Sequence, residues 1–532
     1  MLRKSLVLTF QALLSTCFLL LVLEAACYML GLPQGASDFI ERANINQHLT
    51  YRKPAGQFRI FVYGESTVHG AGYAPTSSPV KWLDAYLKDF LPGRDIKVVN
   101  YGRLGAGSAF IAQAFLDTLQ FKPDLAIFYL GHNTFYLENR VATVNEINAK
   151  FTSRFKLWLH KSRLVSAIVR EVIKVKIRRH SAKPTDVMGT AVIETIISPE
   201  ENGKDKIALP GSPLYQENVQ FFKGNIEKII GAGKEAHVPV LFMKPVCNLK
   251  NYPPNISVHF RNLTGGELEA WDKFYREGLA AAKEKDDFRA LDLFEKAYAI
   301  DPSYADLSFH LGQLYFKRGD LGEARDFFEQ ARDHDAVIRR APKDILNYFD
   351  ELHSQGEIHY FDTEKSFLSR TPGGIPGWPL IEDNVHFSIK GQALAARALA
   401  DEIASRSWIA PRSEWRFHRE RSDEEIKRDL GITDKTLFLN YCSVFGYMGR
   451  RFDERLEFAQ KAIALFPDNP TALRQLAWGY WLTGDKAKAL AIYRSLSKKY
   501  PDALEAAFRA QPELRTSYEA VVLKASNFGE TP

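Results

Sequence analysis

Cysteine is scarce in this chain, and the few that occur are not spaced to bridge or to bind a metal. Of the 532 residues four are cysteines: Cys17 and Cys27 lie in an apolar N-terminal run, whereas Cys247 and Cys442 stand alone. The absence of CxxC spacing argues against a disulfide scaffold and a structural zinc site. No cluster of His, Asp and Glu has metal-ligand spacing either, so we expect no metal and no cofactor. Glycine and proline number only 34 and 25, which excludes collagen and low-complexity chains.

The chain also lacks an excess of positive charge that is spread evenly along its length. The formal net charge is +6, but residues 154–179 hold nine Lys or Arg against Glu171 alone. That segment has a net charge of +8 and the remaining chain −2, so the sequence gives no support for nucleic-acid binding. The apolar residues of the segment 154–179 recur at helical spacing, at Leu157, Leu164, Ile168, Val172 and Val175. We expect a basic helical insertion at about 150–213, and favour packing on the protein over contact with a membrane surface.

The N-terminus carries a long run without charge. Arg3 and Lys4 precede residues 6–23, which include no charged residue. A run of this length can span a bilayer, and leading positive charges favour a cytoplasmic N-terminus. We therefore predict a single transmembrane anchor over residues 1–33 with the rest of the chain extracytoplasmic, periplasmic in a Gram-negative bacterium. A cleaved signal peptide and a lipid-modified Cys27 are the alternatives.

Short apolar runs alternate with helical patterns over two stretches, residues 57–264 and 341–406. The expected strands are residues 58–63, 96–99, 125–130, 238–242 and 357–361. The expected helices between and after them are residues 82–91, 109–120, 217–231, 342–353 and 388–405. Strands separated by helices in this way predict an α/β domain built on a parallel sheet.

Residues 265–340 interrupt this domain with a 34-residue repeat. Matching small and aromatic residues lie one period apart, at Gly278 and Gly312, Ala290 and Ala324, and Phe294 and Phe328. The pattern resembles tetratricopeptide repeats, in which small residues let two helices approach closely; two unrelated helical hairpins are the alternative. A weaker second pair occupies residues 413–510. Such repeats imply a protein partner. Because two repeats rarely bury enough surface alone, we expect each pair to pack on the other or on the α/β domain.

Polar residues follow the expected strands where an open α/β sheet binds its ligands. Ser66 follows the first strand, Gly102 the second and Asn133 the third, and Asp383 and His386 follow a loop after the fifth. Each alone has an ordinary structural explanation, such as a helix cap or a turn. Together they supply a nucleophile in Ser66, a base in His386 and an orienting carboxylate in Asp383. The N–H groups of Ser66 and Gly102 and the amide of Asn133 would stabilise an oxyanion.

These residues resemble the four blocks of the SGNH hydrolases, the GDSL esterase/lipase superfamily. The matching blocks are residues 64–66 (Gly-Glu-Ser), Gly102, residues 131–133 (Gly-His-Asn) and residues 383–386 (Asp-Asn-Val-His). The resemblance implies a flavodoxin-like three-layer α/β/α sandwich and hydrolysis of esters, sometimes with acyl transfer. Glu65 and Thr134 replace acidic residues common in the family, Glu65 an aspartate, and Phe387 replaces a proline. We expect no mechanistic role for Glu65 or Thr134.

Two further histidines lie beside these blocks. His69 is three residues past Ser66, and His132 adjoins Asn133. We expect substrate contacts or structural hydrogen bonds from them rather than general-base catalysis.

The sequence thus predicts a membrane-anchored serine esterase with attached tetratricopeptide repeats. Its expected substrate is an acetyl or acyl ester of an envelope polysaccharide, lipid or similar molecule. Its expected partners are that substrate, a protein bound by the repeats and the membrane around the N-terminal helix. The alternative is a repeat-based adaptor whose SGNH domain is non-catalytic or transfers an acyl group.

Overall fold

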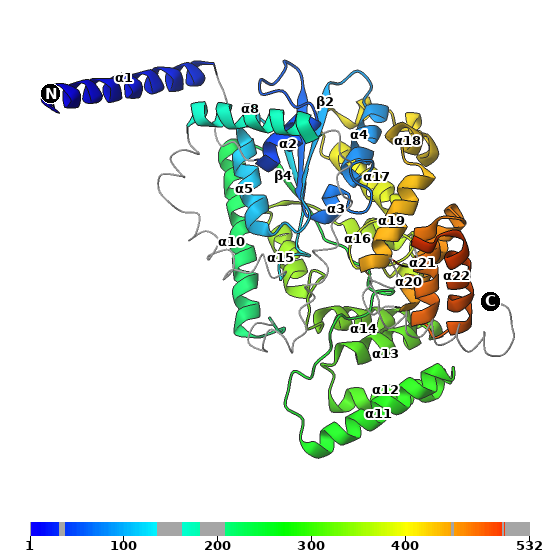
Figure 1. The fold of residues 1–532 in the computed structure, drawn as a ribbon. Helices are drawn as coiled ribbons and strands as arrows, with labels where there is room; N and C mark the ends of the chain where they lie inside the picture. The colour runs from blue at the N-terminus through cyan, green and yellow to red at the C-terminus, as the bar shows by residue number, and fades with distance from the viewer. Residues whose placement is uncertain are drawn as a thin grey trace. The chain divides into compact units, whose positions relative to one another are not determined.

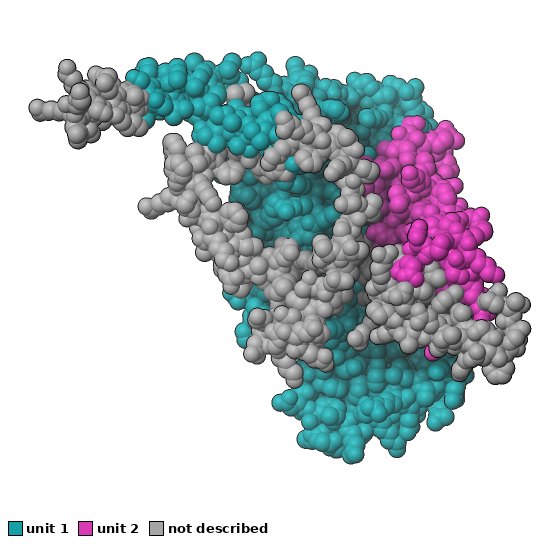
Figure 2. Space-filling model, in the orientation of Figure 1, with its two compact units in different colours: residues 1–71, 78–421 teal, residues 72–77, 422–532 magenta. Residues whose placement is uncertain are grey.

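The computed structural model describes residues 2–30, 38–135, 162–180, 208–447, 452–502 and 505. The chain forms two compact units (Figure 2). The first contains residues 1–71 and 78–421, and the second contains residues 72–77 and 422–532. The predicted insertion at 150–213 is described only at 162–180 and 208–213, and residues 503, 504 and 506–510 of the predicted C-terminal repeats lie outside the described residues.

The first unit is built on a five-stranded parallel sheet with the strand order β2-β1-β3-β4-β5 (Figure 1). The strands are β1 (Phe58–Gly64), β2 (Ile96–Gly102), β3 (Leu125–Tyr129), β4 (Val240–Met243) and β5 (His359–Phe361). This order is that of flavodoxin-like sheets, which bind ligands beside the first strand, where the order reverses. Gly64 pairs with both Gly102 and Tyr129, so β1, β2 and β3 end together at that position.

Helices cover both faces of the sheet. On one face lie α5 (Ser108–Thr118), α10 (Pro213–Ala236) and α15 (Lys343–Ser354), whose apolar side chains share a core with Phe61, Phe128 and Phe242. On the other face lie α4 (Pro79–Phe90) and α17 (Ile389–Ser405), which meet Val62 and Met243. Alternate residues of each strand thus enter opposite layers, as the pleat of a strand requires. The remaining short elements of this unit are α3 (Ser66–His69), η1 (Leu119–Phe121), α16 (Thr363–Leu368), η5 (Pro372–Gly374), η6 (Arg412–Glu414) and η7 (Phe417–Arg419).

The N-terminal prediction needs correction. The first helix, α1, runs from Leu2 to Met29, yet none of the helices within the described residues combines the length and the apolar character that a bilayer span requires. This finding contradicts the predicted transmembrane anchor over 1–33, and the extracytoplasmic location that was deduced from it loses its support. One charged residue of α1, Glu24, has its partners within the protein. Glu24 accepts hydrogen bonds from Ser162 Oγ (2.7 Å) and from the N–H groups of Arg163 (2.7 Å) and Leu164 (2.9 Å).

Those N–H groups belong to the first turn of α8 (Arg163–His180), the basic helix expected from the sequence. The helix is present, but it buries Ser166, Arg170 and Ile173 rather than the apolar face that was predicted. Ile168, Val172 and Val175 are exposed, whereas Arg170 is 3% exposed and pairs with Glu41 at 2.7 Å. Glu41 lies on α2 (Asp38–Asn46). A buried ion pair therefore sets the orientation of α8, which a pattern of apolar residues cannot reveal.

Residues 265–340 form two helical hairpins, the predicted inserted repeats. The helices are α11 (Gly265–Lys283), α12 (Asp287–Ile300), α13 (Ala305–Arg318) and α14 (Leu321–Asp333). Gly278 faces Phe294 and Gly312 faces Phe328 so closely that a Cβ would lie 2.6 and 2.8 Å from the two rings. The small residue at this repeat position is thus required by the close approach of the two helices in each hairpin.

Apart from residues 72–77, the described part of the second unit consists of helices joined by short turns. Its helices are α18 (Asp423–Leu430), α19 (Asp434–Tyr447), α20 (Phe452–Leu465), α21 (Pro470–Leu482) and α22 (Lys486–Lys499). Ala477, Ala489, Tyr493 and Leu496 form one buried cluster between α21 and α22, and a Cβ on Gly479 would lie 3.0 Å from Leu456 Cα. The same device of small residues at a helix contact therefore recurs here.

We expect Gly312→Ala to lower the free energy of unfolding by about 1–3 kcal/mol, since the new Cβ overlaps the Phe328 ring. Gly322→Ala in α14 is the matched control, because nothing lies within 4 Å of its Cβ position and alanine favours helix by up to about 1 kcal/mol. Urea denaturation of the full chain measures both. Equal effects of the two substitutions would contradict the proposed close approach.

Candidate active site

Ser66 lies immediately beyond the end of β1, as the first residue of α3. The turn before it depends on Gly64, where a Cβ would lie 2.4 Å from both Tyr129 O and Val68 Cγ2. Only glycine fits that close approach. Ser66 does not cap the helix: the cap position belongs to Glu65, and Ser66 Oγ instead lies 2.7 Å from His386 Nε2.

His386 and Asp383 lie in one loop before α17. Asp383 Oδ2 is 2.6 Å from His386 Nδ1, and its Oδ1 accepts the N–H groups of Val385 (2.9 Å) and His386 (2.8 Å). One buried carboxylate thus shapes the turn and holds the ring. Because a carboxylate accepts, it favours the tautomer with the proton on Nδ1, which leaves the Nε2 lone pair directed at Ser66.

The electrostatics of this pair fit the geometry. Burial lowers the pKa of His386, but the neighbouring Asp383 carboxylate outweighs it and the pKa is raised above its ordinary value. Burial raises the pKa of Asp383, but the charge and the hydrogen bonds of His386 outweigh it and the pKa is lowered. The pair therefore stabilises an imidazolium next to an ionised carboxylate.

The backbone around Asn133 is held by Glu65, a residue for which no mechanistic role was expected. The Glu65 side chain is buried and accepts the N–H groups of Gly131 (3.0 Å), His132 (3.1 Å) and Asn133 (3.0 Å). Burial raises its pKa to about 7, against the effect of these donors. Asn133 Nδ2 donates to Ala106 O at 3.0 Å. A carboxylate directly after a buried strand was the available signal, since a buried charge needs partners.

Gly102 lies at the end of β2, paired with Gly64. Its N–H donates to Asn100 Oδ1 at 2.7 Å, so the role of oxyanion donor stays a prediction, and one that requires this bond to break. What the structure does explain is the lack of a side chain. A Cβ at Gly102 would lie 2.3 Å from His69 N, because α3 packs directly against this strand end.

Two further histidines near Ser66 make structural hydrogen bonds. His69 Nδ1 lies 3.2 Å from Gly102 O, and burial lowers the pKa of this ring. His132 Nδ1 accepts the Ala341 N–H at 3.1 Å, its Nε2 lies 3.3 Å from Tyr129 Oη, and burial lowers its pKa to about 3. His132 is therefore neutral, and neither ring approaches Ser66 as His386 does.

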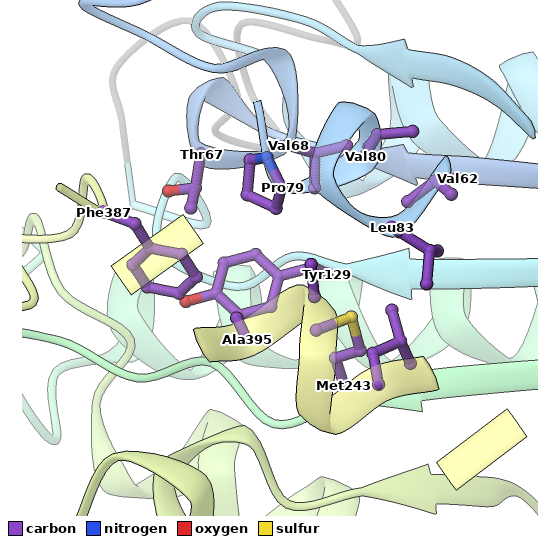
Figure 3. Close-up of a pocket in the computed structure, with 12 residues that line it drawn as sticks. Val62, Thr67, Val68, Pro79, Val80, Leu83, Tyr129, Met243, Phe387 and Ala395 are labelled. Atoms are coloured by element: carbon purple, nitrogen blue, oxygen red, sulfur yellow. The ribbon is translucent and has the colours of Figure 1, made fainter. Parts of the chain in front are cut away.

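An apolar cavity lies between the sheet and helices α3, α4 and α17 (Figure 3). Thr67 and Phe387, the neighbours in sequence of Ser66 and His386, are part of its lining. The other lining residues are Val62, Val68, Pro79, Val80, Leu83, Tyr129, Met243, Ala395, Ala396 and Leu399. The lining carries no charged group. Within the described residues, no three His, Cys, Asp or Glu side chains are grouped so that they could hold a metal ion.

Comparison with protein families identifies the repeats. A tetratricopeptide repeat model matches residues 285–339, and a second one matches residues 471–503. The chain contains tetratricopeptide repeats. One match falls within the inserted pair, and the other covers α21 and α22 in the second unit. The prediction that the inserted repeats are tetratricopeptide repeats is therefore confirmed.

Comparison with solved structures finds distant similarity to two kinds of protein. The acetylxylan esterase Axe2 of Geobacillus stearothermophilus and a catalytic mutant of it are 12% and 11% identical to this chain, each with a TM-score of 0.29; the matches cover 65% of this chain and 94% of theirs. YrrB, a TPR protein with an unusual peptide-binding site, is 17% identical with a TM-score of 0.13, over 44% of this chain and 89% of its own. Scores this low support no conclusion about fold or activity. A search of curated proteins finds no match.

The raised pKa of Glu65 predicts a pH dependence of stability. Its ordinary pKa is 4.5 and its value in the fold is about 7, so the folded chain holds this proton more tightly than the unfolded chain between those values. The stability that the folded chain gains from binding this proton is fully present below pH 4.5 and is lost as pH rises through about 7. The free energy of unfolding of the wild type relative to Glu65→Gln should therefore fall by about 3 kcal/mol across that range.

Chemical denaturation at a series of pH values measures this difference. Glu269→Gln is the control, because Glu269 is exposed and its substitution should leave the curve unchanged. A difference between wild type and Glu65→Gln that stays constant from pH 4.5 to 7 would show that Glu65 does not titrate in this way.

Proposed function

We propose that this chain is a serine esterase in which Ser66 is the nucleophile, His386 the general base and Asp383 the residue that orients it. The observation that carries the proposal is the continuous hydrogen-bonded line from Asp383 through His386 to Ser66, with distances of 2.6 and 2.7 Å. A serine hydroxyl needs a base at this distance to become a nucleophile. The resemblance of the surrounding sequence blocks to SGNH hydrolases is independent support.

The proposed reaction follows from these positions. Ser66 Oγ attacks the ester carbonyl carbon while its proton passes to His386 Nε2, and the carbonyl electron pair moves to the oxygen. The tetrahedral intermediate collapses as His386 returns the proton to the leaving alcohol, which gives an acyl-Ser66 intermediate. Water, activated by His386 in the same way, then releases the acid; a second alcohol in place of water would make the reaction an acyl transfer.

The developing oxyanion needs hydrogen-bond donors that are already in place. We assign this role to the N–H of Ser66 and to the side-chain amide of Asn133, whose loop Glu65 holds through three N–H groups. The amide nitrogen of Asn133 carries two hydrogens, and Ala106 O accepts from it. The Gly102 N–H can act as a third donor only if its hydrogen bond to Asn100 Oδ1 breaks.

The second candidate is an adaptor function, which the tetratricopeptide repeats favour. Repeats of this kind bind peptides or proteins along an extended surface, and such a role needs no chemistry at Ser66. One chain can carry both functions. Whether Ser66 reacts as a nucleophile distinguishes an enzyme from a protein that is an adaptor alone.

We expect Ser66→Ala to abolish labelling by a fluorophosphonate probe and to lower p-nitrophenyl acetate hydrolysis by at least about 10³-fold. Ser212→Ala is the control, because Ser212 caps α10 through Tyr215 N; it should keep full activity while losing about 1 kcal/mol of stability. Hydrolysis at the same rate by wild type and Ser66→Ala would reject the esterase and leave the adaptor.

We expect Asp383→Asn to lower kcat by about 10⁴-fold, as loss of the orienting carboxylate does in serine hydrolases. Since the Asp383 charge raises the pKa of His386 and the base must be neutral, wild-type activity should rise with pH through a value above the ordinary pKa of histidine. In Asp383→Asn the residual activity should rise at a lower pH. Rate measurements from pH 5 to 9 check both effects. An unchanged pH profile would mean that another group sets the protonation of His386.

A further inference from the structure

The loop that carries Asp383 and His386 does not rest on the α/β core alone. Val385, between them, is 4% exposed and belongs to a buried cluster with Phe309 and Phe328 of the inserted repeats. The other members of this cluster are Cys247, Leu249, Ala324, Ala331 and Ile375. Four of the eight members therefore come from the second hairpin, α13 and α14.

The backbone of Val385 connects this cluster with both ends of the candidate site. Its N–H donates to Asp383 Oδ1 at 2.9 Å. Its carbonyl accepts from Thr67 Oγ1 at 3.1 Å, and Thr67 directly follows Ser66. A shift of the Val385 side chain would therefore move the carboxylate that holds His386 and the turn that holds Ser66.

The chain that leaves the repeats fastens the same loop. Asn384 Nδ2 donates to Arg339 O at 3.0 Å, and Asn384 O accepts from Asn248 N at 2.8 Å. Arg340 is 1% exposed and donates to Asn248 O at 3.0 Å. Ala341 donates to His132, next to Asn133. The segment 339–341 thus reaches both loops of the candidate site.

Polar contacts hold the second hairpin against the body of the unit. Gln313 Nε2 donates to Lys250 O at 2.6 Å, and Lys250 Nζ lies 4.7 Å from the centre of the Phe316 ring. Arg325 forms an ion pair with Glu364. The first hairpin is different, because the cluster around Phe294 includes residues of the repeats and of the segment that precedes them, and none of the loop 383–386.

From this we propose that the second hairpin of the inserted repeats is a positioning element for His386, acting through Phe328 and Val385. The two repeats match in sequence but differ in function: the hairpin α13–α14 fixes the geometry of the reacting groups, and the hairpin α11–α12 does not. The inference rests on the proposed function, since it concerns the rate at which Ser66 reacts.

The repeat supplies its own matched control. Phe294 and Phe328 occupy the same repeat position, both are fully buried, and each lies against a glycine of its own hairpin. Phe328→Leu and Phe294→Leu should therefore lower the melting temperature of the full chain to a similar extent. Only Phe328→Leu should reduce kcat for p-nitrophenyl acetate, by tenfold or more with KM changed less than twofold, and slow fluorophosphonate labelling equally. Equal kcat values for the two variants would overturn the proposal.

A double-mutant cycle tests the contact from the other side. Val385→Ala should lower kcat as Phe328→Leu does, and the double variant should be no slower than the worse single variant, because both remove the same support. Val385→Ala combined with Phe294→Leu should instead show the product of the two separate effects. If Phe328→Leu does not fold, Val385→Ala in place of it must still lower kcat with KM unchanged, or the proposal is wrong.

Failure of the esterase function gives a different result from failure of this inference. If wild type and Ser66→Ala hydrolyse the ester equally, the proposed function is rejected. The positioning of His386 is then read from the NMR signal of its Nδ1 proton, which needs no turnover. That signal should shift or broaden in Phe328→Leu and not in Phe294→Leu; an identical signal in both variants overturns the positioning role.

Discussion

The buried carboxylate of Asp383 is the group on which the arrangement of the site depends. It accepts two N–H groups of its own turn through one oxygen and the imidazole of His386 through the other. The ring is thereby fixed in one orientation and one tautomer, 320 residues along the chain from the serine that it meets. Such long-range convergence is possible because all five strands are parallel, so that the loops after their carboxyl ends lie at the same edge of the sheet.

Much of the fold could be predicted because its signals are local. Five buried strands stand out as short apolar runs, and Gly278 with Gly312 marks the repeat period. Ser66, Asn133, Asp383 and His386 could be singled out because each follows a strand end or its loop. The contact between Ser66 and His386 could not be derived from the strand pattern alone, because β3 and β4 separate β1 from β5 in the sheet and the loop after β5 must bring His386 back to Ser66.

The parts that were missed depend on partners distant in sequence. In the sequence, Glu65 looks like a substitution of the family's aspartate without functional consequence. The structure shows that its carboxylate accepts the N–H groups of residues 131–133. The orientation of α8 follows from Arg170 and Glu41, not from its apolar pattern. The partners of Glu24 on α1 are the N–H groups of Arg163 and Leu164, more than a hundred residues along the chain. The N–H of Gly102 donates to the Asn100 side chain two residues away, a contact that the sequence pattern does not reveal.

Of the two inserted hairpins, the second is the one that shares a buried cluster with Val385, and this has a consequence for how such a chain can vary. In the described structure α13 and α14 lie against the α/β domain, and α11 and α12 lie on their far side (Figure 1). Whole repeats added or lost on that far side would leave the support of Val385 untouched. The outer part of the array can therefore lengthen, shorten or change its sequence without disturbing the loop 383–386, whereas the innermost repeat is constrained by the cluster that it shares with that loop.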